Sequence, residues 1–136
     1  MNLFIDGEWD GDRLLSLALV SEPGLEWYRV LSDWALSDWV QQNVVPKLGA
    51  APVPKIDAQK SMVEFLSQFE SVHIIADWPE DIAQFCNFLI TGPGLRIPTP
   101  PLTMEIRRDL NCNESVTPHN ALSDARALRL MYLEAK

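Results

Sequence analysis

Short apolar runs with β character alternate along the chain with longer segments that have a helical period. The first three apolar runs follow one another closely, and a turn signal at residues 22–24 separates the second from the third. Such tight connections predict an antiparallel meander. A buried strand follows later, and a last strand is expected after a proline-rich loop. The predicted strands cover residues 2–6, 12–21, 25–31, 71–76 and 102–106.

Four segments carry apolar residues at helical spacing. In the first of them Trp34 and Trp39 recur near one side, Ser32 or Asp33 is in position to cap the helix, and Pro46 marks an irregular end. The predicted helices cover residues 32–48, 57–69, 80–90 and 120–134.

This order of elements predicts an α/β fold. Strands flanked by helices imply a central mixed sheet that helices cover. The sheet is expected to have five strands, namely the antiparallel three-strand meander and two further strands. With 136 residues, the chain is expected to form a single domain over residues 1–136.

Composition is that of an ordinary globular protein, with 47% hydrophobic and 22% charged residues. No apolar run approaches the roughly 18 residues that a membrane span needs, so no membrane association is expected. The N-terminal sequence MNLFIDGEWDGD has acidic residues where a signal peptide has basic ones. Cys86 and Cys112 stand apart, without the spacing of a metal site. We therefore expect a reduced, cytoplasmic protein.

The net charge bears on whether the protein binds nucleic acid. The formal charge of −8 argues against a nucleic-acid binder, since such proteins usually carry a basic surface. A site for divalent metals is the exception, because it needs clustered carboxylates and the bound cations change the local charge. The charge therefore does not exclude a phosphodiester substrate.

Four acidic residues lie where strands and helices are predicted to meet. Asp6 and Glu8 follow the first strand, two positions apart, so on an extended chain both point to the same side. Asp81 opens the third helix and Asp124 lies in the first turns of the last one. If the first and fourth strands are neighbours, these groups converge at one end of the sheet. They would then need protons or cations to offset their repulsion, and two Mg²⁺ or Mn²⁺ ions about 3.5–4 Å apart would bind a phosphodiester there.

Hydrolysis also needs a group that takes a proton from the attacking water. His119 is the candidate, because histidine titrates near neutral pH and this one lies on a loop just before the last helix. Each residue alone has a plainer interpretation, as a turn, a helix cap or a surface histidine. The four acids and the histidine together are more specific than any one of them.

Three motifs resemble those of the DEDD 3′–5′ exonucleases. FIDGEWDG is similar to the first motif, VHIIADWPEDIAQF to the second, and HNALSDARA to the third motif of the histidine subgroup, DEDDh. The match in order and spacing covers nearly the whole chain, and its third motif is the most specific. Within this superfamily the chain most resembles the small stand-alone bacterial 3′–5′ exoribonucleases, and more distantly the proofreading exonuclease subunits.

The resemblance implies a ribonuclease H-like fold and 3′–5′ release of nucleoside 5′-monophosphates with two divalent metal ions, Mg²⁺ or Mn²⁺. It implies a single-stranded RNA or DNA 3′ end as the substrate, and the acidic surface suggests short oligonucleotides. The roles that it implies are metal binding by Asp6, Glu8, Asp81 and Asp124, proton transfer by His119, and contact of the 3′-terminal nucleotide with Glu8 and the main chain near it, including Gly7.

Some positions leave alternatives open. Gly7 stands where the family usually has a threonine-like residue, which allows close backbone approach but removes a side chain. Asp77 lies four residues before Asp81 and competes with it as the metal ligand, although Asp81 directly precedes the helical pattern IAQF, as the family's acid does. Trp9 either stacks on a terminal base or covers the core.

The predicted function is a metal-dependent 3′–5′ exonuclease, with RNA favoured over DNA. The alternatives are a DNA exonuclease, a phosphohydrolase of small nucleotides, and a catalytically silent binding or assembly protein on the same scaffold. The segment with Trp34 and Trp39 offers an apolar surface for a homodimer. The arginines at 107, 108, 126 and 129 are assigned to solvated surface rather than to phosphate contacts.

Overall fold

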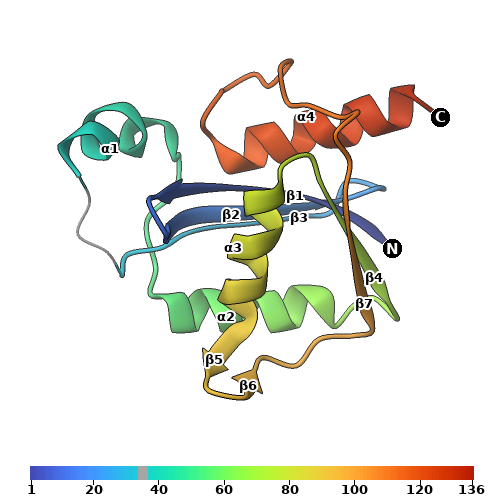
Figure 1. The fold of residues 1–136 in the computed structure, drawn as a ribbon, viewed down its shortest axis with the longest axis horizontal. Coiled ribbons are helices and arrows are strands. Elements are labelled where there is room, and N and C mark those ends of the chain that lie inside the picture. The colour runs from blue at the N-terminus through green and yellow to red at the C-terminus, as the bar shows by residue number, and fades with distance from the viewer. Residues whose placement is uncertain (34–36) are drawn as a thin grey trace.

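A five-stranded mixed sheet forms the centre of the molecule (Figure 1). The computed structural model describes residues 1–33 and 37–136. Within the sheet the strand order is β3-β2-β1-β4-β7. The strands are β1 (Asn2–Asp10), β2 (Arg13–Ser21), β3 (Glu26–Val30), β4 (Val72–Ala76) and β7 (Leu102–Ile106).

The pairing agrees with the predicted meander and its two further strands. β2 pairs antiparallel with both β1 and β3, whereas β4 runs parallel to β1 and β7 runs parallel to β4. The α/β class and the five-stranded mixed sheet are therefore confirmed. Because β1, β4 and β7 are parallel, their carboxyl ends face the same edge of the sheet.

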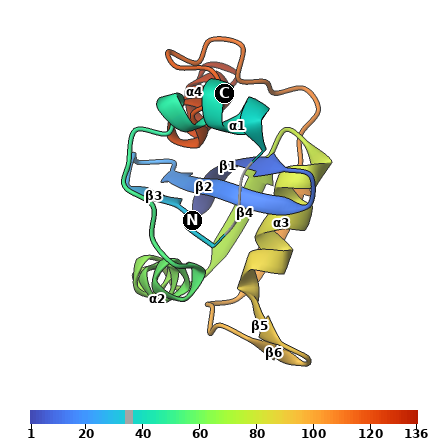
Figure 2. The same ribbon diagram turned by 90° about the vertical axis from the view of Figure 1, so that its left-hand side faces the viewer.

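Helices cover both faces of the sheet (Figure 2). Along β1 the side chains alternate, so that Leu3 and Ile5 join the core cluster with α2 and α3, whereas Phe4 packs with Leu128 of α4. α1 packs on the same face as α4, through Val40 and the buried residues of β2 and β3. The helices are α1 (Asp38–Asn43), α2 (Lys55–Leu66), α3 (Pro79–Leu89) and α4 (Ala121–Glu134).

The predicted helix over residues 32–48 is wrong in its extent. The described part of this segment has only the short α1 and a 3-10 turn, η1 (Val45–Lys47). Ser37 caps α1, since its Oγ accepts from the Val40 N–H at 3.3 Å. Asp33 instead accepts from the main-chain N–H of Lys55 at 2.7 Å, and Ser32 pairs through its main chain with residue 53. Neither of them caps the helix, and Trp34 lies outside the described residues.

The first strand is longer than predicted. β1 continues to Asp10 because Glu8, Trp9 and Asp10 still pair with β2, with an irregularity between Glu8 and Trp9. The sequence predicts that Asp6 and Glu8 follow the first strand, but in the structure both lie within it. Pairing with β2 holds them on a rigid element.

Two further boundaries differ from the prediction. α2 begins at Lys55, directly after Pro54, and ends at Leu66, so it starts and stops earlier than the predicted helix. A hairpin of β5 (Ile90–Gly92) and β6 (Leu95–Arg96) follows α3. Gly94, with φ of 69°, supplies its left-handed turn residue. No helix among the described residues is long and apolar enough to cross a membrane.

Candidate metal centre

Five carboxylates converge at the edge of the sheet where β1 extends beyond the end of β4. In one group, oxygens of Asp6, Glu8 and Asp124 all lie within 4.8 Å of one another. In a second group the same holds for Asp6, Asp77 and Asp81. Asp6 belongs to both groups, so the two sets of acids share one central carboxylate.

Strand alternation and one helix position the first group. Asp6 and Glu8 have the same parity as Phe4, so they face α4 from β1. Asn120 directly precedes α4 and caps it, since its side chain accepts from the Ser123 N–H at 3.0 Å. Asp124 then lies in the first turn, on the buried side of α4 that contains Ala121, Ala125 and Leu128. An acid on that side points into the sheet.

The second group depends on the end of β4. The last pair between β1 and β4 is Phe4 with Ile75, so Gly7 lies beyond the register of β4. Its main-chain N–H donates to Asp81 Oδ1 at 3.1 Å. Asp81 is 1% exposed in the first turn of α3. The side chain of Asp81 therefore takes the place of a strand partner and is held firmly against β1.

Gly7 faces away from the acids. A Cβ at this position would lie 3.3 Å from Leu14 Cδ1 and 3.3 Å from the Ser16 carbonyl oxygen, and 3.5 Å from Leu17 Cδ1. These contacts belong to β2 and to the core side of the sheet. The absence of a side chain at Gly7 thus removes nothing from the face that carries Asp6 and Glu8, and it relieves a tight contact with β2.

Both candidates for the second motif reach Asp6. Asp81 is buried and hydrogen-bonded, whereas Asp77 is only partly buried. Burial raises the pKa of Asp77, and the nearby Arg108 opposes that effect. The preference for Asp81 over Asp77 as the metal ligand stays a prediction. Asp77 lies close enough to Asp6 to bind the same cation.

Burial and mutual repulsion raise the pKa values of the acids. The pKa of Asp6 lies well above its usual 3.8, first because of burial and then because of Asp81, Asp124 and other neighbouring carboxylates. Burial, followed by the charge of Asp124, raises the pKa of Glu8 to about 7. The pKa values of Asp81 and Asp124 are also raised, with burial as the largest cause. The group as a whole is costly to ionise unless cations accompany it.

Two buried oxygens in the cluster have no hydrogen-bond partner, namely Asp6 Oδ2 and Asp124 Oδ1. An unpartnered buried carboxylate oxygen is unfavourable. Carboxylates are also the ligands that hard divalent cations such as Mg²⁺ prefer. The donor set and its unpartnered oxygens therefore fit divalent cations.

His119 lies beside the first group. It is exposed and has φ of 68°, and no other described residue except glycine has a positive φ. Such a conformation persists only where surrounding contacts impose it. The neighbouring Asn120 is held in place, since its Nδ2 donates to the main-chain oxygens of Lys47 at 2.8 Å and Leu48 at 3.1 Å. The charge and main chain of His119 act to lower the pKa of Asp124, so histidine and acid are in electrostatic contact.

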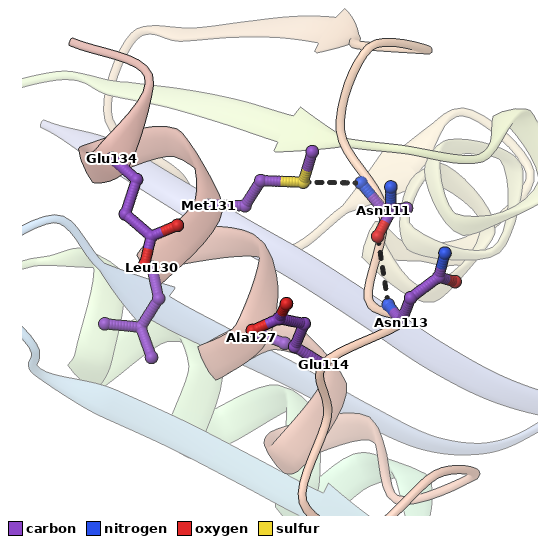
Figure 3. Close-up of a pocket in the computed structure, with 7 residues that line it drawn as sticks. All are labelled: Asn111, Asn113, Glu114, Ala127, Leu130, Met131 and Glu134. Atoms are coloured by element: carbon purple, nitrogen blue, oxygen red, sulfur yellow. Dashed lines mark hydrogen bonds between the residues drawn. The ribbon is translucent and has the colours of Figure 1, made fainter.

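The loop before His119 is fastened to α4. Ser123 Oγ accepts from the Thr117 N–H at 2.9 Å and lies 2.8 Å from Ser115 Oγ. Further back, the Asn111 N–H donates to Met131 Sδ at 3.3 Å (Figure 3). A hollow of about 360 Å³ lies between this loop and the helix, lined by Asn111, Asn113, Glu114, Ala127, Leu130, Met131 and Glu134. None of the predicted site residues lines it, so it is separate from the carboxylates.

Two tryptophans lie near the acids in sequence. Trp9 follows Glu8 on β1 and is partly buried, and its contact with a base stays a prediction. Trp78 follows Asp77, is 49% exposed, and lies under the Arg108 guanidinium, 4.8 Å from the ring centre. Arg108 was expected on the solvated surface. The pairing of β4 with β7 brings it next to Trp78, and the local sequence does not indicate that pairing.

The chain matches no protein-family model, and no curated protein matches it. The chemistry of the site therefore rests on the five carboxylates and His119. Of these, Asp6 is the residue on which both acid groups depend.

Proposed function

We propose that this chain is a metal-dependent 3′–5′ exonuclease with a ribonuclease H-like fold, acting on the 3′ end of single-stranded RNA in preference to DNA. The observation that carries the proposal is the carboxylate of Asp6, which is common to two groups of acids. A carboxylate that belongs to two ligand sets can hold two adjacent cations, as a two-metal mechanism uses. The likeness of the three motifs to the DEDDh exonucleases supports the same assignment.

The residues that would hold the cations are Asp6, Glu8 and Asp124 for one, and Asp6 with Asp81 for the other, with Asp77 as the alternative to Asp81. Two divalent ions, Mg²⁺ or Mn²⁺, supply charge stabilisation for the phosphate during hydrolysis. Their charge also relieves the repulsion that raises the pKa values of these acids.

His119 accepts the proton of the attacking water. Its side chain is exposed beside Asp124, on the loop before α4, where it can reach a water at the acids. Attack at phosphorus breaks the bond to the 3′ oxygen of the preceding nucleotide. The phosphate stays on the departing nucleotide, which leaves as a nucleoside 5′-monophosphate.

Residues of β1 would bind the terminal nucleotide. Glu8 and the main chain near Gly7 lie next to the shared carboxylate on a paired strand, so a sugar bound there is held in one position relative to Asp6. Trp9 follows on the same strand, where its ring is partly exposed for stacking on the terminal base.

The test is incubation of the protein with 5′-labelled single-stranded RNA and DNA in Mg²⁺, Mn²⁺ or EDTA. The expected result is a ladder that shortens from the 3′ end in either metal, is absent in EDTA, and forms faster on RNA. Asp6→Asn should give no ladder, whereas Glu64→Gln, which alters an exposed acid on α2, should behave as the natural chain does. Faster cleavage of DNA would favour a DNA exonuclease, and binding without cleavage in either metal would favour a catalytically silent binding protein.

A further inference from the structure

A tryptophan and an arginine lie together beside the carboxylates. β4 and β7 are parallel and end in register, with Ala76 opposite Ile106. The main-chain N–H of Arg107 also donates to the Ala76 carbonyl at 2.7 Å. The residues that follow the two strands, Trp78 and Arg108, therefore meet at the same edge of the sheet as the acids.

The two consecutive arginines at this edge have different partners. Arg107 makes a two-bond ion pair with Asp109 and lies near Glu105, so its charge is neutralised. Arg108 donates through Nη1 to the main-chain oxygen of Asp77 and stacks on Trp78. It makes no ion pair with any residue in the described part of the chain.

Two other cations near α4 are paired with acids, whereas Arg129 donates to the main-chain oxygen of Glu22 at 2.7 Å. Arg126 contacts Glu26, and Lys136 contacts Glu22.

Arg108 is exposed and its charge acts on Asp77 without forming an ion pair with that carboxylate. In a chain of net charge −8, such an arginine is suited to bind an external anion. A guanidinium presents five N–H donors in a planar array that matches phosphate. Among residues 1–33 and 37–136, Arg108 donates a hydrogen bond through Nη1 alone.

The ring beneath it adds a second kind of contact. Trp78 is 49% exposed although it is held at the start of α3, where its backbone immediately precedes Pro79. An exposed indole on a fixed backbone provides a stacking surface for an unpaired base. Stacked arginine also keeps its hydrogen-bonding edge free.

We propose that Trp78 and Arg108 form the binding site for the nucleotide that precedes the cleaved bond in a single strand, with Arg108 on a phosphate and Trp78 on the base. This inference rests on the proposed function, because it takes the 3′ end to lie at Asp6. Asp77 connects the two sites, since its carboxylate belongs to the acid group and its carbonyl accepts from Arg108. The substrate class is then an oligonucleotide with an unpaired 3′ end rather than a mononucleotide ester.

Two substrates separate this site from the reacting centre. One is a short single-stranded RNA, and the other is the p-nitrophenyl ester of uridine 5′-monophosphate, which retains the reacting phosphate but lacks a preceding nucleotide. Arg108→Gln should raise KM for the RNA about tenfold with little change in kcat, and should alter hydrolysis of the ester less than about twofold. The dependence of RNA affinity on salt should also become shallower by about 0.7 in log–log slope, the value for one phosphate contact in a single strand.

Arg96→Gln is the matched control, because Arg96 is also exposed and also donates to a main-chain oxygen, that of Ile97 in the distant hairpin region. It should leave both substrates and the salt slope unchanged. Trp78→Ala should weaken RNA binding about tenfold, and Trp78→Phe should restore most of it, which distinguishes stacking from a general loss of structure.

Equal losses on RNA and on the ester in Arg108→Gln would overturn the assignment, as would no loss on either. If the natural chain hydrolyses neither substrate, the proposed function fails, and fluorescence anisotropy of a labelled RNA then decides on this site alone. Unchanged affinity and salt slope in Arg108→Gln would refute it, and weaker binding with a shallower slope would support it.

Discussion

Without divalent cations, the carboxylate cluster is expected to make the fold less stable as the pH rises towards neutrality. Glu8 gives the clearest measure of this effect. Burial and the charge of Asp124 raise its pKa from 4.5 to about 7. Between these two values the folded protein keeps a proton that the unfolded chain has lost, so the free energy of unfolding falls across this range and does not recover above it.

The magnitude follows from the same pKa values. A tenfold change in acidity corresponds to about 1.4 kcal/mol, so the full shift of Glu8 corresponds to about 3–4 kcal/mol. Water reaches this partly exposed group, which reduces the cost of its ionisation to folding to about 2–3 kcal/mol. That is a substantial fraction of the 5–15 kcal/mol, roughly, by which a domain is usually stable.

The assay is urea denaturation in EDTA at several pH values from 4.5 to 8, followed by circular dichroism. Glu8→Gln lacks this titration, so its stability relative to the natural chain should rise by about 2–3 kcal/mol over the range. Glu64→Gln, with its altered carboxylate exposed on α2, should show no such rise. Mn²⁺ should reverse the loss in the natural chain, because a bound cation favours the ionised acids. A difference between the natural chain and Glu8→Gln that does not vary with pH would refute the reasoning.

Three further predictions concern individual residues of the centre. Asp124→Asn should abolish cleavage and sharply reduce the rise in Tm that Mn²⁺ produces, and an unchanged rise would argue against its role as a ligand. His119→Ala should lower kcat by about 10²–10⁴-fold while the Mn²⁺-dependent rise in Tm remains, since a general base is not needed for metal binding; a fully active variant would exclude His119 as the base. Asp81→Asn should be inactive while Asp77→Asn keeps measurable cleavage, and the reverse result in the same RNA assay would make Asp77 the ligand of the second motif.

Local pattern sufficed for much of the fold. Alternation along β1 predicted that Asp6 and Glu8 share a face, and the acid group that they form with Asp124 agrees with it. Turn signals likewise predicted the meander of β1, β2 and β3. These features depend on neighbours in the chain, so the sequence carries them directly.

Boundaries were less predictable because partners far along the chain set them. β1 runs to Asp10 since β2 continues to pair with it, and no residue near position 6 signals that extension. The helix expected at residues 32–48 is short in the described residues, because Asp33 and Ser32 bond to the segment at Val53–Lys55 instead of capping a helix. Tertiary hydrogen bonds here override a weak local preference.

The sequence by itself predicted the acids and the histidine of the candidate centre from their spacing along the chain, and it left Asp77 and Asp81 as alternatives. Only the tertiary structure decided that Asp6 is shared between two groups, that Gly7 turns towards β2 and leaves its N–H for Asp81, and that Arg108 lies on Trp78. The direction of Gly7 follows from the antiparallel pairing of β1 with β2. The sharing of Asp6 and the contact of Arg108 with Trp78 depend on the parallel pairing of β4 with β1 and β7, which joins segments that are distant in sequence. Pairing between distant strands is stabilised by burial of the whole sheet and not by any one motif, so no local sequence pattern predicts it.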